Sequence, residues 1–172
     1  VTACRSFLKE MKRGWQLINN DIDIQLCLRH ASEAMNNQRI AYGAATREVE
    51  YDSKTKEISF LGTSPHDATA QQARWRPFQI AFVLANIERA SQVEERSDKS
   101  VDVIWMPTGG GKTEAYLGLS AFIILWERRL QILEKRKGSK AGTTKVFMRY
   151  TYRLLTIQQL TRAASLICAL EI

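Results

Sequence analysis

Apolar side chains recur at helical spacing through the first forty residues of the chain. Within residues 3–40, one group of apolar positions shares a helix face before residue 19, and a second group does so after residue 21. The groups are Phe7, Met11, Trp15 and Ile18, and then Ile24, Cys27, Leu28, Ala31 and Met35. The residues NND at 19–21 supply a break and N-cap residues between the two groups. The pattern predicts two consecutive helices.

Residues 41–70 lose this helical period. The stretch is rich in Ser, Thr, Gly, Pro and Asp, which favours a connector, with a short strand near residues 57–61. We therefore divide the chain into a helical N-terminal segment with its connector, residues 1–70, and a second part, residues 71–172.

The second part alternates helical and strand-like patterns. Residues 71–90 predict a helix that starts at about Pro77, because proline fits a first helical turn. The short apolar runs 101–106 and 144–150 predict buried strands, residues 112–136 a long helix, and the chain from Leu154 onward another helix. Strand, glycine turn, helix, strand and helix in this order predict an α/β fold with parallel strands and flanking helices.

Composition and charge narrow the class of protein only moderately. The formal net charge of +7 favours polyanionic partners such as nucleic acid, although many basic domains bind none. Three widely spaced cysteines make a disulfide framework or a zinc site a poor fit, and suit a reducing cytoplasm. The longest apolar stretch, residues 121–126, is too short to span a membrane. The chain lacks an initiator Met and ends inside an apolar-periodic segment, so we expect a piece of a longer protein.

The strongest chemical signal is the sequence MPTGGGKT at residues 106–113. Gly109, Gly110 and Gly111 let successive backbone N–H groups point into one concavity, and the following helix adds its N-terminal partial charge. Lys112 can then reach the β- and γ-phosphates of a nucleotide, and the hydroxyl of Thr113 can ligate Mg²⁺. The pattern for such a loop has glycine where this chain has Met106. The alternative is a flexible glycine turn followed by a solvated lysine.

Glu114 follows the loop directly. It can accept a hydrogen bond near the magnesium shell, or remain a solvated first-turn carboxylate that the helix dipole favours.

Two flanking segments, RWRPFQIAF at 74–82 and MRYTYRLLTIQQ at 148–159, make the chain resemble superfamily 2 helicases. In that family a glutamine upstream of the phosphate loop recognises adenine, often beside an aromatic and a basic residue; Gln79, Phe78 and Arg76 match this placement. The family's loop reads A-x-T-G-x-G-K-T, which this chain matches from Thr108 onward. A glutamine amide suits adenine because it offers a donor and an acceptor. Taken alone, without the resemblance, Gln79 is interpreted first as a solvated helical glutamine.

The segment after the second predicted strand carries the other half of the resemblance. The family shows P-T-R-x-L-x-x-Q there, in a loop that touches the nucleic-acid backbone; this chain keeps Arg153, Leu155 and Gln158 but has Thr151 and Tyr152 for Pro-Thr. The resemblance implies that Arg153 and Gln158 bind nucleic acid. Arg153 alone is also compatible with a surface charge, and residues 134–140, EKRKGSK, with either a DNA contact or a solvated loop.

The resemblance is closest to the large helicases of bacterial anti-phage systems, especially the DISARM type, with the Druantia type more distant. It runs from about residue 24 to the end and is strong over residues 74–172. It implies that residues 71–172 are the N-terminal part of a first RecA-like domain, with ATP and Mg²⁺ as cofactors. The implied partners are nucleic acid, DNA rather than RNA, and a defence-system protein. The implied location is the cytoplasm, away from membranes.

An ATP-driven motor of this family also needs an Asp-Glu motif and a second RecA-like domain with an arginine finger, which this sequence lacks. We therefore expect the full-length protein to be an ATP-dependent helicase or translocase and the isolated chain to be inactive. Two alternatives stay open: a P-loop kinase or another P-loop NTPase, and an interaction module that binds nucleotide without motor activity.

Overall fold

The computed structural model describes residues 2–43, 48–61, 74–92, 101, 110–133, 144–149 and 157–171. Most of these residues are helical. The helices are α1 (Thr2–Asn20), α2 (Ile22–Gly43), α3 (Pro77–Ser91), α4 (Lys112–Ile132) and α5 (Ile157–Ala169), and the strands are β1 (Glu48–Asp52) and β2 (Glu57–Leu61). None of the helices in these ranges is both long and apolar enough to cross a bilayer.

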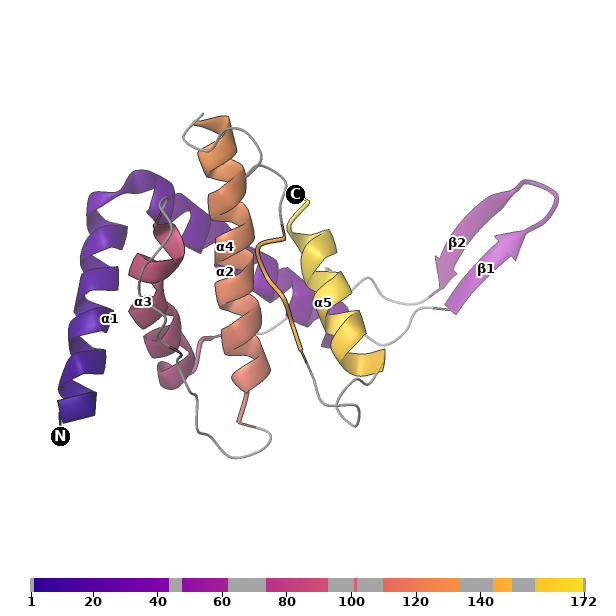
Figure 1. The fold of residues 1–172 in the computed structure, drawn as a ribbon. Helices are drawn as coiled ribbons and strands as arrows, with labels where there is room; N and C mark the ends of the chain where they lie inside the picture. Colours follow the sequence, from indigo (N-terminus) through magenta and orange to yellow (C-terminus); the bar gives the residue numbers. More distant parts are fainter. Residues whose placement is uncertain are drawn as a thin grey trace.

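The helices pack in a spatial order that differs from their order in the chain. Helix α1 packs along α3, α3 beside α4, α4 against α2, and α2 against α5 (Figure 1). One apolar core joins these contacts, and its largest fully buried side chains include Phe122 and Leu130 of α4, Ile87 of α3 and Leu166 of α5. Ile18 and Ala31 from the N-terminal helices belong to the same core. The core thus contains side chains from both sides of residue 70. The division of the chain at that residue stays a prediction.

A single residue, Asp21, separates α1 from α2 and acts as the N-cap of α2. Asp21 Oδ1 accepts hydrogen bonds from the backbone N–H groups of Asp23, at 2.9 Å, and Ile24, at 3.2 Å. These bonds satisfy donors that the first turn of α2 cannot use internally. The two predicted N-terminal helices and their N-cap are confirmed.

Helix α1 reaches α3 at a glycine. A Cβ atom at Gly14 would lie closer than 3.0 Å to the carbonyl oxygen of Leu84, so the two helix backbones are in direct contact there. A second glycine, Gly118 of α4, makes room for the indole ring of Trp75, which precedes α3. Trp126 of α4 donates from Nε1 to the Ser91 carbonyl oxygen at 2.9 Å and so ties α4 to the end of α3.

Helix α2 contributes a buried thiol and an ion pair to its contact with α4. Arg129 Nη2 lies 2.6 Å from Asp23 Oδ1. Burial raises the pKa of the nearby Cys27 thiol from its ordinary value of 9.0 to about 11, while the Arg129 charge acts in the opposite direction. Cys27 is therefore a neutral, buried apolar group at pH 7, whereas Cys4 and Cys168 are exposed.

The only sheet in the described ranges is a two-stranded antiparallel hairpin. Its register pairs Glu48 with Leu61 and Asp52 with Glu57, and Asp52 Oδ1 accepts the N–H of Lys54 at 2.7 Å inside the turn. The hairpin projects away from the helices (Figure 1). The predicted strand at 57–61 is confirmed, whereas sequence reading missed its partner β1.

The predicted α/β fold, a RecA-like domain with parallel strands and flanking helices, was wrong. No parallel strands occur within the described ranges, and helices pack on helices instead. Residues 144–149 form no strand: they lie beside α4 and α5, with the Phe147 side chain 84% exposed. A buried strand needs a neighbouring strand and two covered faces. Within the described structure this segment has no neighbouring strand, and only its side toward α4 and α5 is partly covered. Of the other predicted strand only Val101 is described, and residues 102–106 lie outside those ranges.

Candidate nucleotide site

The first turn of α3 is closed by a glutamine side chain. Arg76, the N-cap residue, has the extended backbone that a residue before proline prefers, with φ −70° and ψ 147°. Its N–H donates to Gln79 Oε1 at 2.8 Å. Gln79 is buried, so this bond fixes its amide at the start of the helix.

The guanidinium group of Arg76 and the NH₂ group of Gln79 bind the glycine turn that leads into α4. Gln79 Nε2 donates to the Gly111 carbonyl oxygen at 2.8 Å, and Arg76 Nη1 donates to the Gly110 carbonyl oxygen at 2.9 Å. More than thirty residues of chain separate the partners. The structure therefore brings the predicted adenine-reading residues into direct contact with the predicted phosphate loop.

Gly111 is required at this junction for two reasons. Its φ is +87°, in the left-handed region where a side chain costs about 1–2 kcal/mol. A Cβ atom there would also lie 2.8 Å from Gln79 Nε2 and 3.3 Å from Glu114 Oε2. Both the conformation of the turn and its contact with α3 thus depend on glycine.

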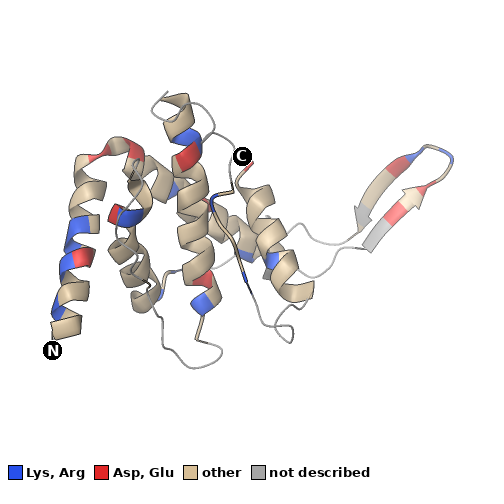
Figure 2. Cartoon of the chain, in the orientation of Figure 1, with Lys and Arg blue, Asp and Glu red and all other residues tan. Residues whose placement is uncertain are grey.

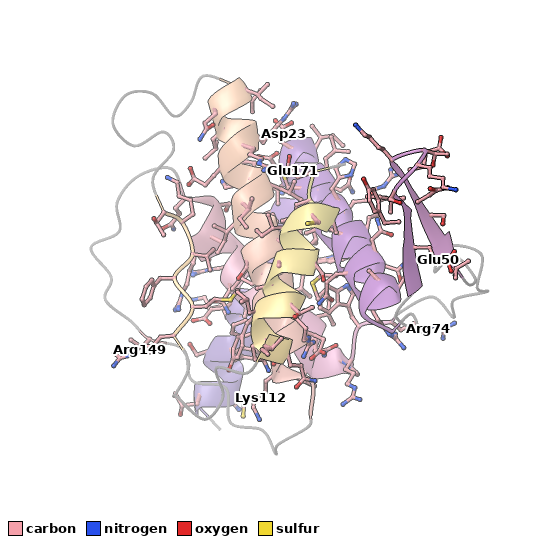
Figure 3. All side chains as sticks on the ribbon, turned by 90° about the vertical axis from the view of Figure 1, so that its right-hand side faces the viewer. Asp23, Glu50, Arg74, Lys112, Arg149 and Glu171 are labelled. Carbon is pink, nitrogen blue, oxygen red and sulfur yellow. The ribbon has the colours of Figure 1, made fainter. Side chains whose placement is uncertain are left out.

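Lys112, Thr113 and Glu114 occupy the first turn of α4, where backbone N–H groups that have no acceptor within the helix, together with the helix dipole, attract anions. Figure 3 places Lys112 at the lower end of the helical layer, with Asp23 and Glu171 at the upper end. Glu114 forms a hydrogen-bonded ion pair with Arg162 of α5. Glu114 is therefore not simply a solvated carboxylate in this arrangement, and its role near a magnesium shell stays a prediction.

A cavity of about 490 Å³ opens beside the junction, within the size range of small-ligand sites. Helices α2, α4 and α5 and the residues around the start of α3 all contribute to its wall. The lining residues are Ser32, Met35, Asn36, Gln38, Arg39, Arg74, Trp75, Arg76, Gln79, Gly111, Glu114 and Arg162. Four guanidinium groups against one carboxylate make the cavity suitable for an anionic ligand.

The other predicted site residues lie at or beyond the edges of this arrangement. Phe78 is half-buried in the first turn of α3, and Gln158 is exposed in the first turn of α5. Thr108, Gly109 and Arg153 lie outside the described residues.

The sequence analysis did not identify Arg39, Arg74 and Arg162 as residues of the candidate site, although all three line its cavity. Arg162 had a usable signal, because it follows Gln158 by one helical turn and so shares its face. Arg39 had none, because only the packing of α2 brings it to the cavity that Gly111 also lines.

The amide of Gln79 retains hydrogen-bonding capacity. Its NH₂ group has two hydrogens and its oxygen two lone pairs, and the junction uses one of each. A ligand could thus still use one donor and one acceptor.

The described ranges contain no group of three or more His, Cys, Asp or Glu side chains that could hold a metal ion by themselves. Mg²⁺ at Thr113 would need phosphate oxygens and water as its remaining ligands, which is the usual arrangement for this ion.

Comparison with known proteins gives one informative relation. No protein-family model matches the chain, and no solved structure matches it. The DISARM protein DrmA of Bacillus paralicheniformis (strain ATCC 9945a / NCIMB 11709 / CD-2) is 36% identical over 171 residues, which is 99% of this chain. This confirms the expected relation to DISARM proteins. The chain is therefore related to a segment of the DISARM protein DrmA and spans 14% of that protein's length.

Proposed function

We propose that this chain is the ATP-binding segment of a longer ATP-driven nucleic-acid translocase that acts in bacterial anti-phage defence. The observation that carries the proposal is the junction in which Arg76 and Gln79 bond the carbonyl groups of Gly110 and Gly111. Residues proposed to read the base and residues proposed to hold the phosphates thus share one hydrogen-bonded unit beside a basic cavity. The relation to DrmA supports the defence context.

The chemistry of these residues suits binding rather than hydrolysis. Lys112 supplies a positive charge at a helix N-terminus, and Gln79 fixes the turn while keeping one donor and one acceptor. Bound ATP with Mg²⁺ would supply the phosphoanhydride bond whose hydrolysis drives movement. The sequence has no Asp-Glu motif to orient an attacking water, so the proposal assigns turnover to the full-length protein.

The test is nucleic-acid-stimulated ATP hydrolysis by the full-length protein, together with protection of cells against phage. We expect Lys112→Ala to lower hydrolysis at least about 100-fold, because it removes the charge at the β- and γ-phosphates. Lys54→Ala, on the exposed hairpin turn, is the matched control and should behave as wild type. Wild-type turnover in Lys112→Ala would refute the role given to this lysine.

One observation favours a second function, an interaction module in which nucleotide only fixes the fold. The Gln79 amide already bonds protein groups at both ends, as a purely structural glutamine would. The module predicts ATP binding without stimulated hydrolysis. It also predicts similar affinities for ATP and GTP, whereas an adenine-reading Gln79 predicts at least about tenfold preference for ATP.

A further inference from the structure

The outward face of α1 carries a row of cations. Because successive helical residues are 100° apart, Arg5, Lys9 and Lys12 lie on the side opposite Gly14, which contacts α3. All three are exposed. Beside them, on one flank, are two exposed apolar side chains, Leu8 at 49% and Trp15 at 56%.

The charges toward α3 are compensated, and those on the outward face are not. Glu10, the single carboxylate of α1, lies 3.6 Å from Arg89 of α3, and Arg13 lies 3.7 Å from Glu88. Within the described part of the chain, no carboxylate lies within ion-pair distance of Arg5, Lys9 or Lys12. Figure 2 shows this concentration of basic residues along α1.

The spacing of the row fits a nucleic-acid strand. At a rise of 1.5 Å per residue, Arg5 and Lys12 lie about 10 Å apart along the helix, a span that covers two to three phosphates. The exposed indole of Trp15 lies less than one turn beyond Lys12, where it can stack on an unpaired base.

We propose that Arg5, Lys9, Lys12 and Trp15 form a binding surface for single-stranded nucleic acid. The surface deepens the proposed function, on which it rests for its biological context, by adding a contact that does not involve the ATP site. Lysine is depleted from protein–protein interfaces, which disfavours a protein partner. A membrane is disfavoured because α1 packs extensively against α3, which leaves three exposed apolar side chains, Phe7, Leu8 and Trp15, to insert.

The first test measures the salt dependence of binding to a fluorescently labelled single-stranded 20-mer by the full-length protein without nucleotide. Replacing Arg5, Lys9 and Lys12 together by Gln should reduce the slope of log K against log salt by about 2, because three phosphate contacts on a single strand contribute about 0.7 each. An unchanged slope would overturn the proposal.

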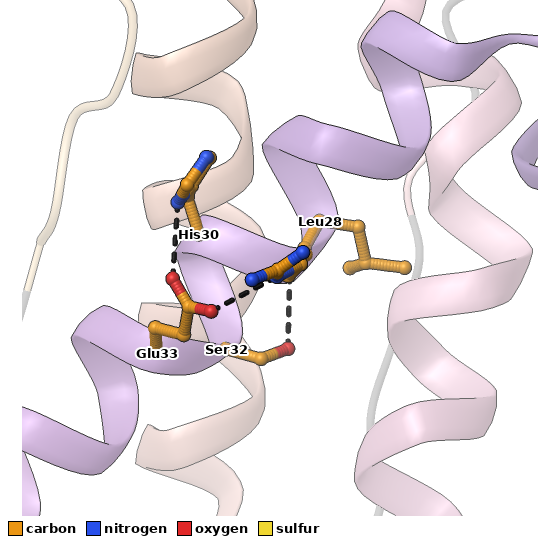
Figure 4. A network of polar contacts seen from close by, with 5 residues as sticks. Leu28, His30, Ser32 and Glu33 are labelled. Atoms are coloured by element: carbon orange, nitrogen blue, oxygen red, sulfur yellow. Dashed lines mark hydrogen bonds and ion pairs between the residues drawn. The ribbon is translucent and has the colours of Figure 1, made fainter.

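A matched control removes three positive charges elsewhere, through Arg29→Gln, Lys54→Gln and Lys56→Asn. Arg29 is suitable because Glu33 already pairs with it at 3.0 Å, in the network that also holds His30 (Figure 4). Asparagine is used at residue 56 because that position has φ 58°, which Asn tolerates. The slope should stay at the wild-type value. A fall equal to that of the α1 variant would mean that net charge alone governs binding and would overturn the proposed surface.

The second test concerns the aromatic contact and the choice of ligand. Trp15→Ala should weaken binding to the single strand about tenfold, and Trp15→Phe should restore most of it, whereas affinity for a duplex of the same sequence should not change. Tighter binding to phosphatidylserine vesicles than to the 20-mer, lost in the same variants, would overturn the proposal in favour of a membrane. Lys112→Ala should leave every one of these values unchanged, so failure of the ATP site and failure of the α1 surface give different results.

Discussion

Helix α3 meets a glycine on each of two sides, and the two contacts have opposite character. At Gly14, the backbone of α1 touches the Leu84 carbonyl group of α3, among apolar side chains. At Gly111, the turn before α4 touches the polar side chains of Gln79 and Arg76, beside a cavity. The first contact allows two helices to approach, whereas the second holds a loop in one conformation next to space for a ligand.

The difference predicts separate effects on stability and on the proposed nucleotide binding. A backbone carbonyl cannot move without its helix, so the Gly14 contact constrains the whole α1–α3 packing. Side-chain amide and guanidinium groups can rotate, so the Gly111 contact can exchange protein partners for ligand partners. Substitutions at the two glycines should therefore affect different measurements.

The largest effect on folding should come from Gly14→Ala. The new Cβ would lie closer than 3.0 Å to the Leu84 carbonyl oxygen, and relief requires a shift of α1 as a whole. We expect a loss of about 3 kcal/mol in the free energy of unfolding, measured by urea titration. Gly118→Ala is the matched control, because it meets the Trp75 side chain, which can move, and it should cost less. A larger loss of unfolding free energy in Gly118→Ala than in Gly14→Ala would contradict the conclusion that the backbone contact at Gly14 is the harder one to relieve.

Gly111→Ala should have a smaller effect on stability and a larger one on ligand binding. The left-handed φ and the approach of Gln79 Nε2 together should cost about 1–2 kcal/mol in unfolding. ATP affinity, measured by isothermal calorimetry on the full-length protein, should fall at least about tenfold, because the turn can no longer present its N–H groups. Gly14→Ala, assayed below its unfolding transition, should keep wild-type ATP affinity. Equal ATP affinities for wild type and Gly111→Ala would break the distinction between the two glycines.

Arg162→Met should have a smaller effect again. The substitution removes the ion pair between α5 and Glu114 but keeps most of the buried stem, and Glu114 remains partly open to water. We expect a loss of about 0.5–1 kcal/mol in unfolding that shrinks at 1 M salt. The double variant Glu114→Gln with Arg162→Met should be no less stable than the single variant Arg162→Met. Full additivity of the two substitutions would contradict a direct interaction.

The smallest expected effect is a change in stability at alkaline pH, and it concerns Cys27. Its folded pKa of about 11 lies above the ordinary value of 9.0, so folding favours the protonated thiol. The contribution is fully present below pH 9 and is lost as the pH rises toward 11. Urea midpoints of wild type and Cys27→Ala should therefore converge between pH 9 and 11. Iodoacetamide should modify Cys4 and Cys168 well before Cys27, and equal rates would contradict its burial.

Local signals in the sequence were enough to predict the helices. Asp21 as N-cap, Pro77 in a first turn and Lys112 after glycine all act over three or four residues, and each one marks a helix start in the structure. Periodicity likewise identified core positions such as Ile24 and Ala31.

The parallel sheet was predicted from short apolar runs, and such runs do not specify their neighbours. Residues 144–149 look like a buried strand by composition, yet Phe147 is exposed and no strand pairs with the segment within the described ranges. The partner of β2 was missed although the residues EVEYD that form β1 alternate charged and apolar side chains, as a strand with one polar face does. Three charged residues in five, in a stretch assigned to a connector, masked this signal.

The closeness of Arg76 and Gln79 to the glycine turn was predictable from the sequence, but their hydrogen bonds were not. The motif placed Arg76 and Gln79 near the predicted phosphate loop, whereas their hydrogen bonds to the Gly110 and Gly111 carbonyl groups depend on how α3 meets α4. Arg39 reaches the cavity only through the packing of α2.

The contact of the Trp75 ring with Gly118 places an intrinsic fluorophore at the cavity. Its indole lines the cavity and donates from Nε1 to Ser32 Oγ at 3.4 Å, so any ligand that enters the cavity changes the polarity around the ring. Trp126, by contrast, is buried and stacked on Phe122, and its emission reports whether the core is intact. Fluorescence from variants that retain one of these tryptophans would follow cavity occupancy and unfolding as two separate signals, without an added label.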